Sequence, residues 1–405
     1  MPLLELIALF AVARVFGELC ERVRVPALIG EIGAGIVLGP LLLRLVLPSD
    51  PIKLVADLGV FFIVYEAGME MTFRGVRRTI KESGAAVAAG SFALPFLLGF
   101  QVGLALDYDP RTAVFFGLAL SLTALPVSVR ILTDMGWLNT DVGQTIVTAG
   151  LLCDIAGLTV LAAITNWGAL TGGDVTVTGV VVGKIVLFFL ATLTIERVLA
   201  HREGWLAKRI QSASHSLLSQ GAAFSVPLLM VFGSALLAEF LGLHFVIGTF
   251  FGAVIVAEHV FPPREGERLR ANIAAVSRGF LAPIFFGYLG LVAVSFEFGL
   301  ATLFAALLVA AVLGKVVGSY AAARFSGFQS WSASMIAVGM NGRGAMELVI
   351  ALVGLELGII TAPVFSILVL LGLVTTLMTP FGLRWLARLP RRGRATAAKE
   401  APPAS

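Results

Sequence analysis

Long apolar segments, separated by short polar connections, recur along almost the whole chain. A helix rises 1.5 Å per residue and needs about 20 mainly apolar residues to cross the hydrocarbon core of a bilayer. The pattern therefore predicts about thirteen membrane-spanning helices. They cover residues 3–20, 26–43, 52–71, 84–106, 112–133, 142–166, 177–196, 217–242, 244–260, 277–295, 299–325, 331–357 and 361–387.

Two of these segments are interrupted by residues that disturb a helix. The fifth contains Ser121-Leu-Thr123-Ala-Leu-Pro126-Val-Ser128, and the twelfth contains Gly339-Met-Asn341-Gly342-Arg343-Gly344. Proline removes a backbone donor, and glycine weakens a helix. Both residue types are also tolerated in ordinary membrane helices, so the proline alone is weak evidence for a break. The cluster of glycines with asparagine and arginine is much stronger.

The two interruptions lie at similar depth in segments that run in opposite directions. This placement predicts that the two halves of the chain are related by an inverted repeat. Paired broken helices of this kind indicate a transporter's substrate site, because free backbone groups and helix ends can contact ions there.

One acid lies near the middle of the sixth segment. If that helix begins near Val142, Asp154 lies about 18 Å along it, close to the centre of the bilayer. Lys315 lies about 15 Å from the inner end of its own segment by the same reasoning. A charge at this depth is costly, so a lysine and an aspartate at similar depth are expected to compensate each other. The simpler alternative is a static ion pair that only orients helices.

Composition supports a membrane protein and excludes several other classes. Hydrophobic residues make up 58% of the chain, charged residues make up 13%, and 44 of the 405 residues are glycine. The two cysteines, Cys20 and Cys153, cannot build a disulfide framework, and no Cys/His cluster has metal-ligand spacing. We therefore expect no cofactor and no resident metal ion. The chain also lacks the motifs of known intramembrane enzymes, so we expect no enzyme activity.

The basic residues indicate an orientation. With the N-terminus outside, 22 of the 29 Lys and Arg residues fall in inward connections, at the inner ends of the segments or in the C-terminal tail. The positive-inside rule therefore predicts an outer N-terminus and a cytoplasmic C-terminus. This asymmetry explains the net charge of +4 without a nucleic-acid partner. We expect one transmembrane domain over residues 1–389 and a basic, disordered cytoplasmic tail over 390–405.

The motifs, taken in order, resemble the monovalent cation:proton antiporters of the NapA/Kef type, in the cation:proton antiporter-2 family. They are Ser121-Leu-Thr-Ala-Leu-Pro126-Val-Ser-Val-Arg130, Cys153-Asp154, Gly314-Lys315 and Met340-Asn-Gly-Arg343-Gly-Ala-Met-Glu347-Leu. The resemblance extends to about residue 387. It implies an all-α polytopic fold of about thirteen helices, in which a core domain with two crossed broken helices moves against a dimerisation domain. The functional unit would then be a homodimer.

The resemblance also assigns roles to individual residues. Asp154 would carry the cation and the proton in turn, and Lys315 would compensate its charge. From the competition of cation and proton for this acid we expect Thr123, Ser121 and Cys153 to be the other ion- or proton-binding residues. Pro126, Asn341, Arg343 and Glu347 would support the broken helices. Arg343 and Glu347 are four residues apart, so they can pair if the helix resumes between them. The substrates would be Na⁺ or K⁺ and H⁺, and the protein would act in pH homeostasis, surrounded by lipid in the cell (inner) membrane.

One position departs from the family pattern. Well-known members carry Asp-Asp or Asn-Asp where this chain has Cys153-Asp154. A thiol is a weak ligand for Na⁺ or K⁺, which prefer oxygen. The cation, the stoichiometry and the electrogenicity therefore stay open at this stage. An uncoupled cation channel or permease, or a non-transporting sensor, on the same fold are the alternatives.

Overall fold

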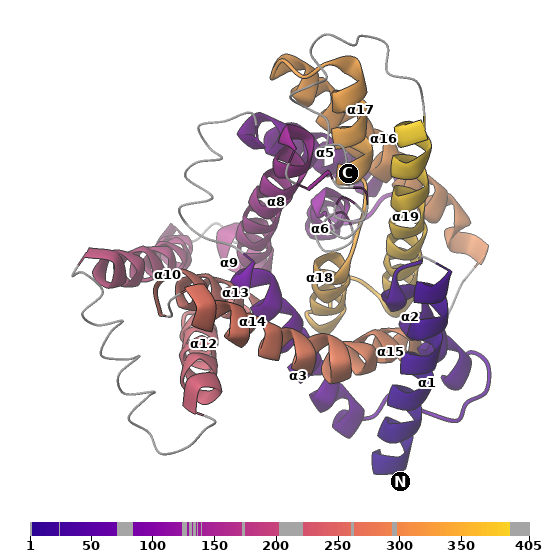
Figure 1. Cartoon of the computed structure of the whole chain (residues 1–405), viewed down its shortest axis with the longest axis horizontal. Coiled ribbons are helices and arrows are strands. Elements are labelled where there is room, and N and C mark those ends of the chain that lie inside the picture. Colours follow the sequence, from indigo (N-terminus) through magenta and orange to yellow (C-terminus); the bar gives the residue numbers. More distant parts are fainter. Residues whose placement is uncertain are drawn as a thin grey trace. The chain divides into compact units, whose positions relative to one another are not determined.

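The computed structural model describes residues 2–23, 25–70, 84–123, 128, 132, 135, 137, 138, 140–171, 175–201, 222–260, 263–293 and 298–388. Every regular element in these residues is a helix, as the hydrophobic pattern predicts (Figure 1). The chain divides into two compact units, which are described separately. Unit 1 comprises Met1–Leu6, Ser49–Gly75 and Ala162–Phe286, and unit 2 comprises Ile7–Pro48, Val76–Leu161 and Gly287–Ser405.

Unit 1 is built around the long helix α3. Its elements are α3 (Asp50–Met69), α9 (Trp167–Thr171), α10 (Val175–His201), α12 (Ala222–Phe240), α13 (Phe245–Ile255), the π-helix η1 (Val256–Val260), α14 (Pro263–Val276) and the π-helix η2 (Ser277–Leu281). Aromatic side chains join α3 to α12, since the rings of Phe61 and Phe232 stack with their centroids 4.2 Å apart. Glycines allow α13 to approach α12. A Cβ on Gly248 would lie 2.7 Å from the Cα of Ala235, so a side chain at this position would force the two helices apart.

Two acids at the end of α3 are held by arginines of the same unit. Arg278 contacts Glu66 at 2.5 Å, and Arg270 contacts Glu70 at 3.1 Å. Both arginines belong to the α14–η2 segment. These ion pairs fasten α3 to that segment, so the two acids have a structural function within unit 1.

Unit 2 contains both interrupted segments. Its elements are α2 (Ala27–Leu38), α5 (Gly84–Ala105), α6 (Pro110–Ser121), the 3₁₀ turn η3 (Phe298–Leu300), α16 (Ala301–Phe325), α17 (Ser330–Met340), α18 (Ala345–Glu356) and α19 (Ala362–Arg388). Three helices have residues in both units, namely α1 (Pro2–Arg22), α8 (Asp141–Thr165) and α15 (Ala282–Val292). Helix α5 packs along α16 and α6, and α17 packs against α16.

Glycines bring α16 close to α5. A Cβ on Gly314 would lie 2.6 Å from the Cα of Pro95, and one on Gly318 would lie 3.0 Å from the carbonyl carbon of Gly90. Both glycines therefore allow the two helix backbones to approach closely. Lys315 lies between them in sequence, so the close approach also fixes the position of this lysine along α5.

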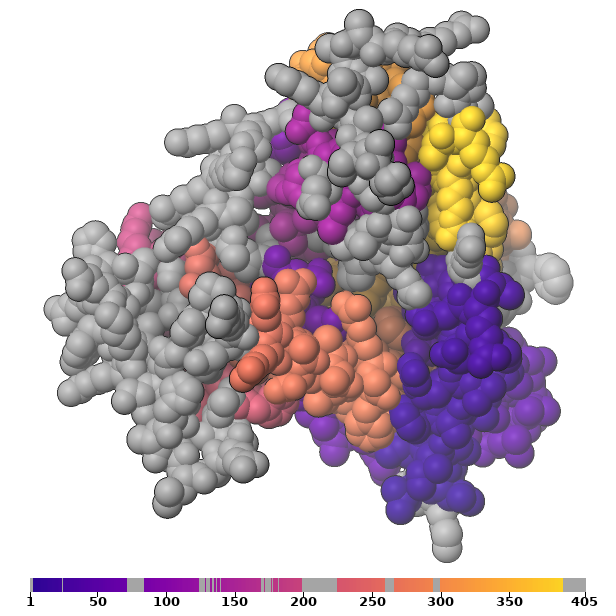
Figure 2. All heavy atoms as spheres, in the orientation of Figure 1, coloured from indigo at the N-terminus to yellow at the C-terminus, as the bar shows by residue number. Residues whose placement is uncertain are grey.

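Helix α19 of unit 2 exposes a group of large apolar side chains. On α19, drawn in yellow in Figure 2, the exposed apolar side chains are Leu377, Met378, Phe381 and Trp385. In the described residues, six helices are long and apolar enough to cross a membrane, or seven if the bent α17–α18 pair is one span. The expected count of thirteen stays a prediction, as do the inverted repeat and the domain boundary at residue 389. The tail over 390–405 lies outside the described residues.

Candidate functional site

Helix α6 ends abruptly inside unit 2. Leu122 follows its last residue with φ −73° and ψ 158°, an extended conformation that stops the helix. The last four carbonyls of any helix have no partner within the helix, and inside a membrane they need another donor. The break predicted around Ser121 and Thr123 is therefore present on its N-terminal side. Pro126 lies outside the described residues.

Lys315 provides one of these donors. Its side chain is fully buried, at 0% exposure. The ammonium nitrogen donates to the carbonyl of Ser121 at 2.5 Å and to the hydroxyl of Thr123 at 2.7 Å. A positive charge is also favoured there because a helix C-terminus carries partial negative charge. The lysine thus acts as a cap for α6.

Arg343 supplies the other donors from the second broken segment. Helices α17 and α18 are bent by 41° at a break between Met340 and Ala345. From this break Arg343 donates through Nη2 to the carbonyl of Leu120 at 2.7 Å, and through Nη1 to that of Ala119 at 3.3 Å. Three successive carbonyls at the end of α6 are therefore bound by two buried cations.

Glu347 balances the charge of Arg343. The Nη1 of Arg343 lies 3.1 Å from the Oε1 of Glu347, one helical turn later in α18, and the side chains are 0% and 1% exposed. The predicted i, i+4 pair is present. Glu347 lies in the first turn of α18, where a negative charge is favoured by the helix dipole.

Two hydroxyl groups donate hydrogen bonds to carbonyls at or near the break in the second segment. Ser128 donates to the carbonyl of Gly339 at 2.7 Å, so the region after α6 is tied to the end of α17. Thr376 of α19 donates to the carbonyl of Arg343. Asn341 caps α17 through its backbone and is buried at 3% exposure. Ser128 and Thr376 were not assigned a role from sequence, although each is a polar residue in an apolar span.

Helix α8 places the central acid in the same unit. Asp154 is 4% exposed, and its charge lies within interaction range of Lys315. The neighbouring Cys153 is fully buried, with its sulfur 3.2 Å from the hydroxyl of Ser91 and 3.7 Å from the carbonyl of Ala88. Both of these partners belong to α5. Ser91 is a site neighbour that the sequence pattern did not single out.

The two hydroxyls expected beside Asp154 have different surroundings. The Ser121 hydroxyl donates to the carbonyls of Gly117 at 2.7 Å and Phe92 at 3.0 Å. The Thr123 hydroxyl accepts from Lys315 and also interacts with the thiol of Cys153. A hydroxyl oxygen has two lone pairs, so Thr123 keeps one acceptor position. Thr123 is thus the residue that joins α6, α8 and α16.

The cluster therefore contains two buried cations and two buried acids. They are Lys315, Arg343, Asp154 and Glu347. Their formal charges cancel when both acids are ionised. The described residues include no group of three or more His, Cys, Asp and Glu residues that could hold a metal ion.

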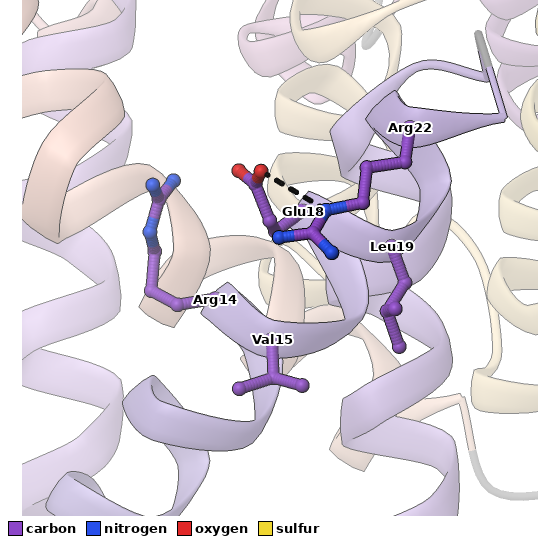
Figure 3. A pocket seen from close by; sticks show the side chains of 5 residues that line it. All are labelled: Arg14, Val15, Glu18, Leu19 and Arg22. Carbon is purple, nitrogen blue, oxygen red and sulfur yellow. Dashed lines mark ion pairs between the residues drawn. The ribbon is translucent and has the colours of Figure 1, made fainter.

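A groove on α1 is a separate feature of the surface. It is lined by Arg14, Val15, Glu18, Leu19 and Arg22 (Figure 3). Glu18 pairs there with Arg22 at 3.5 Å, and Arg14 lies 4.0 Å from Glu31 of α2. The Glu18 and Arg22 side chains are mostly exposed. The groove therefore lacks the buried charges that distinguish the α6–α8–α16–α18 cluster.

Two interrupted helices whose breaks meet at a buried charge cluster define the class of ion-coupled membrane transporters. The chain belongs to the sodium/hydrogen exchanger family, since the model of its transmembrane region matches residues 6–389.

Related proteins span nearly the same length. The chain is 28% identical to a Na⁺/H⁺ antiporter of Enterococcus hirae, with 96% of this chain and 99% of that protein covered. It is 29% identical to the Na⁺/H⁺-K⁺ antiporter GerN of Bacillus cereus, covering 91% and 92%. The sodium proton antiporter MjNhaP1 of Methanocaldococcus jannaschii has the same fold, with a TM-score of 0.68 at 15% identity and coverage of 96% and 99%. The predicted all-α antiporter fold is confirmed.

Proposed function

We propose that this protein is a secondary active transporter that exchanges a monovalent cation for protons. The observation that carries this proposal is a buried aspartate, Asp154, whose charge lies within interaction range of the buried Lys315. A carboxylate in such a place must be neutralised by a bound ion, by a proton or by a neighbouring cation. Family membership supports the same conclusion, and the names of the relatives support Na⁺ or K⁺ as the cation.

The coupling follows from competition for one carboxylate. Ionised Asp154 binds a cation, with oxygens of Thr123 and Ser121 as further ligands. Protonated Asp154 is neutral and has little attraction for a cation. If the site opens to one side of the membrane at a time, each release of a cation requires the uptake of a proton, and exchange is obligatory.

The residues around the site keep the same arrangement whether Asp154 holds a cation or a proton. Lys315 and Arg343 hold the end of α6, and Glu347 balances Arg343, so these three residues keep the break in place while the occupant of Asp154 changes. We propose that unit 2, which contains both breaks, carries the site during alternating access. The physical reason is that its buried hydrogen bonds link the end of α6 to α16 and to the break between α17 and α18.

We further propose the setting in which this exchange takes place. The protein would work as a homodimer in the cell (inner) membrane, in contact with lipid, with its N-terminus outside and its C-terminus in the cytoplasm. The distribution of basic residues supports this orientation. Exchange of cations for protons would contribute to pH homeostasis, and no enzyme activity is required for it.

Proton flux in proteoliposomes tests the proposal. Vesicles with an acidic interior and a trapped pH dye would receive Na⁺, K⁺ or Li⁺ outside. We expect the wild type to release protons in response to its substrate cation, and Asp154→Asn to abolish the response. The matched control is Asp141→Asn, because Asp141 lies in the first turn of the same helix and is exposed. The control should respond as the wild type does.

Other outcomes would identify the alternatives. Equal responses in the wild type and Asp154→Asn would contradict the proposed coupling. Cation flux without proton release would indicate a channel or permease on this fold. The absence of any flux would indicate a sensor.

A further inference from the structure

We infer that Thr376 of α19 is a positioning residue for cation binding, and that it acts through the backbone of Arg343. The inference rests on the proposed function, since it concerns the cation site around Asp154. Thr376 is fully buried, and its hydroxyl donates to the carbonyl of Arg343, 33 positions earlier in the chain. The contact joins the continuous helix α19 to the break between α17 and α18.

One face of α19 follows this break. Gly372, Thr376 and Thr379 recur at helical spacing, so they lie on the same side of the helix. A Cβ on Gly372 would lie 3.7 Å from the Oε2 of Glu347, and a Cβ on Gly342 would lie 3.2 Å from the Oγ1 of Thr379. The bent segment therefore packs along this face of α19 both before and after the residue whose carbonyl Thr376 binds.

The hydrogen bond from Thr376 fixes the backbone from which the Arg343 side chain extends. The guanidinium of Arg343 reaches the carbonyls of Leu120 and Ala119 at the end of α6, at 2.7 and 3.3 Å. An arginine side chain is long and flexible, so holding it in one position costs conformational entropy. Without a fixed backbone the guanidinium would hold the end of α6 less firmly. Thr376 therefore influences the position of that end through Arg343.

The end of α6 carries two residues of the proposed cation site. In the proposed function, oxygens of Ser121 and Thr123 are ligands of the cation beside Asp154. Ligands that are already in place bind more tightly than ligands that binding must first order. Lys315 would still hold the carbonyl of Ser121 and the hydroxyl of Thr123. Loss of the Thr376 contact should therefore weaken cation binding without abolishing it.

Thr375 provides a matched control one residue away. It is also fully buried, but its hydroxyl donates to the carbonyls of Leu371 and Gly372 in its own helix, at 2.8 and 3.2 Å. The general cost of removing a buried hydroxyl would be seen at both threonines. An effect that passes through Arg343 would be seen only at Thr376.

The cation dependence of proton flux in proteoliposomes tests the inference. Separate titrations with Na⁺ and K⁺ would compare the wild type with Thr376→Val, Thr376→Ser and Thr375→Val. In Thr376→Val we expect the half-saturating cation concentration to rise about fivefold, which corresponds to the loss of one hydrogen bond of about 1 kcal/mol. The maximal rate per folded protein should change little. Thr376→Ser should recover most of the wild-type affinity, and Thr375→Val should match the wild type.

Two results would overturn the inference. One is a lower maximal rate in Thr376→Val with an unchanged half-saturating concentration, because a merely structural function predicts that pattern. The other is an equal shift in Thr376→Val and Thr375→Val. If Thr376→Val does not fold, Thr376→Cys replaces it, since a thiol is a weak donor and should shift the affinity in the same direction.

A second measurement separates this inference from the proposed function. Cation binding raises the melting temperature of the purified protein, and the concentration dependence gives the affinity without transport. A wild type that shows no exchange would contradict the proposed function, whereas the melting series still compares the affinities of the variants. The same rise in the wild type and in Thr376→Val at every Na⁺ and K⁺ concentration, or no rise in either, would overturn the inference about Thr376.

Discussion

The ammonium of Lys315 lies 2.7 Å from the hydroxyl of Thr123, although the two residues are 192 positions apart in the sequence. This contact joins the end of a broken helix to the middle of an uninterrupted one. The positive charge of Lys315 is therefore bound at the C-terminal end of α6, and the carboxylate of Asp154 is not the only group that it interacts with. The lysine therefore has a structural function at the end of α6 in addition to any effect on ion binding.

Removal of the Thr123 hydroxyl should destabilise the protein. In Thr123→Val the buried lysine loses an acceptor, and leaving such a donor without its partner costs about 1–3 kcal/mol. Thermal unfolding in detergent would show the loss. Thr123→Ser should keep most of the stability, since the hydroxyl is retained. Thr159→Val is the matched control, because Thr159 is an exposed residue of α8 and should have little effect. Equal stability of Thr123→Val and wild type would contradict the capping function.

Arg343 and Glu347 should be strongly coupled. Arg343→Met leaves a buried carboxylate uncompensated and two carbonyls of α6 without donors, so we expect a loss of about 3–5 kcal/mol. The double variant Arg343→Met/Glu347→Leu should lose less than the sum of the single variants, because it removes the isolated charge. Denaturation of the four proteins gives the coupling energy. A strictly additive result would rule out a functional ion pair. Arg388→Met, at the exposed end of α19, is the control for loss of an arginine.

Helices α16 and α5 lie so close together at Gly314 that there is no room for a side chain at this position. A Cβ there would lie 2.6 Å from the Cα of Pro95, so Gly314→Ala must separate the helices. We expect a loss of about 1–3 kcal/mol from this overpacking, together with slower exchange because Lys315 moves. Gly233→Ala is the matched control, since Gly233 is exposed in α12 with no atom near the added methyl. It should be neutral or stabilising by up to about 1 kcal/mol. Similar melting temperatures for the two variants would contradict this packing argument.

Asp109 is the N-cap residue of α6, and its carboxylate should make the stability of the folded protein depend on pH. Partial burial raises the pKa of this acid, but hydrogen bonds from Thr112 and from the backbone of Thr112 and Arg111 lower it by more, so the pKa lies below its usual 3.8. A lowered pKa stabilises the folded state above the unfolded value, and this contribution is lost as the pH falls through the folded value. Asp109→Ala should cost about 0.5–2 kcal/mol at neutral pH.

The pH dependence distinguishes the charge from the cap itself. Asp109→Asn keeps a side-chain oxygen for the cap but cannot titrate. The difference between the wild type and this variant should therefore shrink as the pH drops below about 4, where the carboxylate is protonated. Unfolding measured over a pH series provides the comparison. A difference that grows toward low pH would contradict the assigned shift.

Several features of the fold and the site could be predicted from the chain alone. The apolar segments predict the helices, and the cluster of glycines with Asn341 and Arg343 predicts the break between α17 and α18. The predicted interruption of the fifth segment is present where α6 ends at Ser121, whereas Pro126 lies outside the described residues. Lys315 and Asp154 were placed in one site because both are charges at similar depth. The Arg343–Glu347 pair follows from helical spacing, and the structure shows it at 3.1 Å.

Other features depend on contacts that sequence spacing does not encode. The acceptors of Lys315 are on α6, and nothing in the lysine's own segment indicates which carbonyl it meets. Leu122 takes an extended conformation without being glycine or proline, so the helix end could not be located to the residue. Likewise α2 is only 12 residues long, against the expected 26–43, because the chain turns to an extended conformation at Gly39. The contact of Cys153 with Ser91 requires α5 and α8 to be placed side by side.

The caps of α6 also affect how the protein is made. Lys315 and Arg343 follow their acceptors by 194 and 223 positions, so they are synthesised long after α6 has left the ribosome. At roughly 5–20 residues per second, this delay is on the order of 10–45 s. During that interval the carbonyls at the end of α6 lack these two donors. Final docking of α6 must therefore be a late step in biogenesis, and a chain truncated before Lys315 should be recognised by membrane quality control as incomplete.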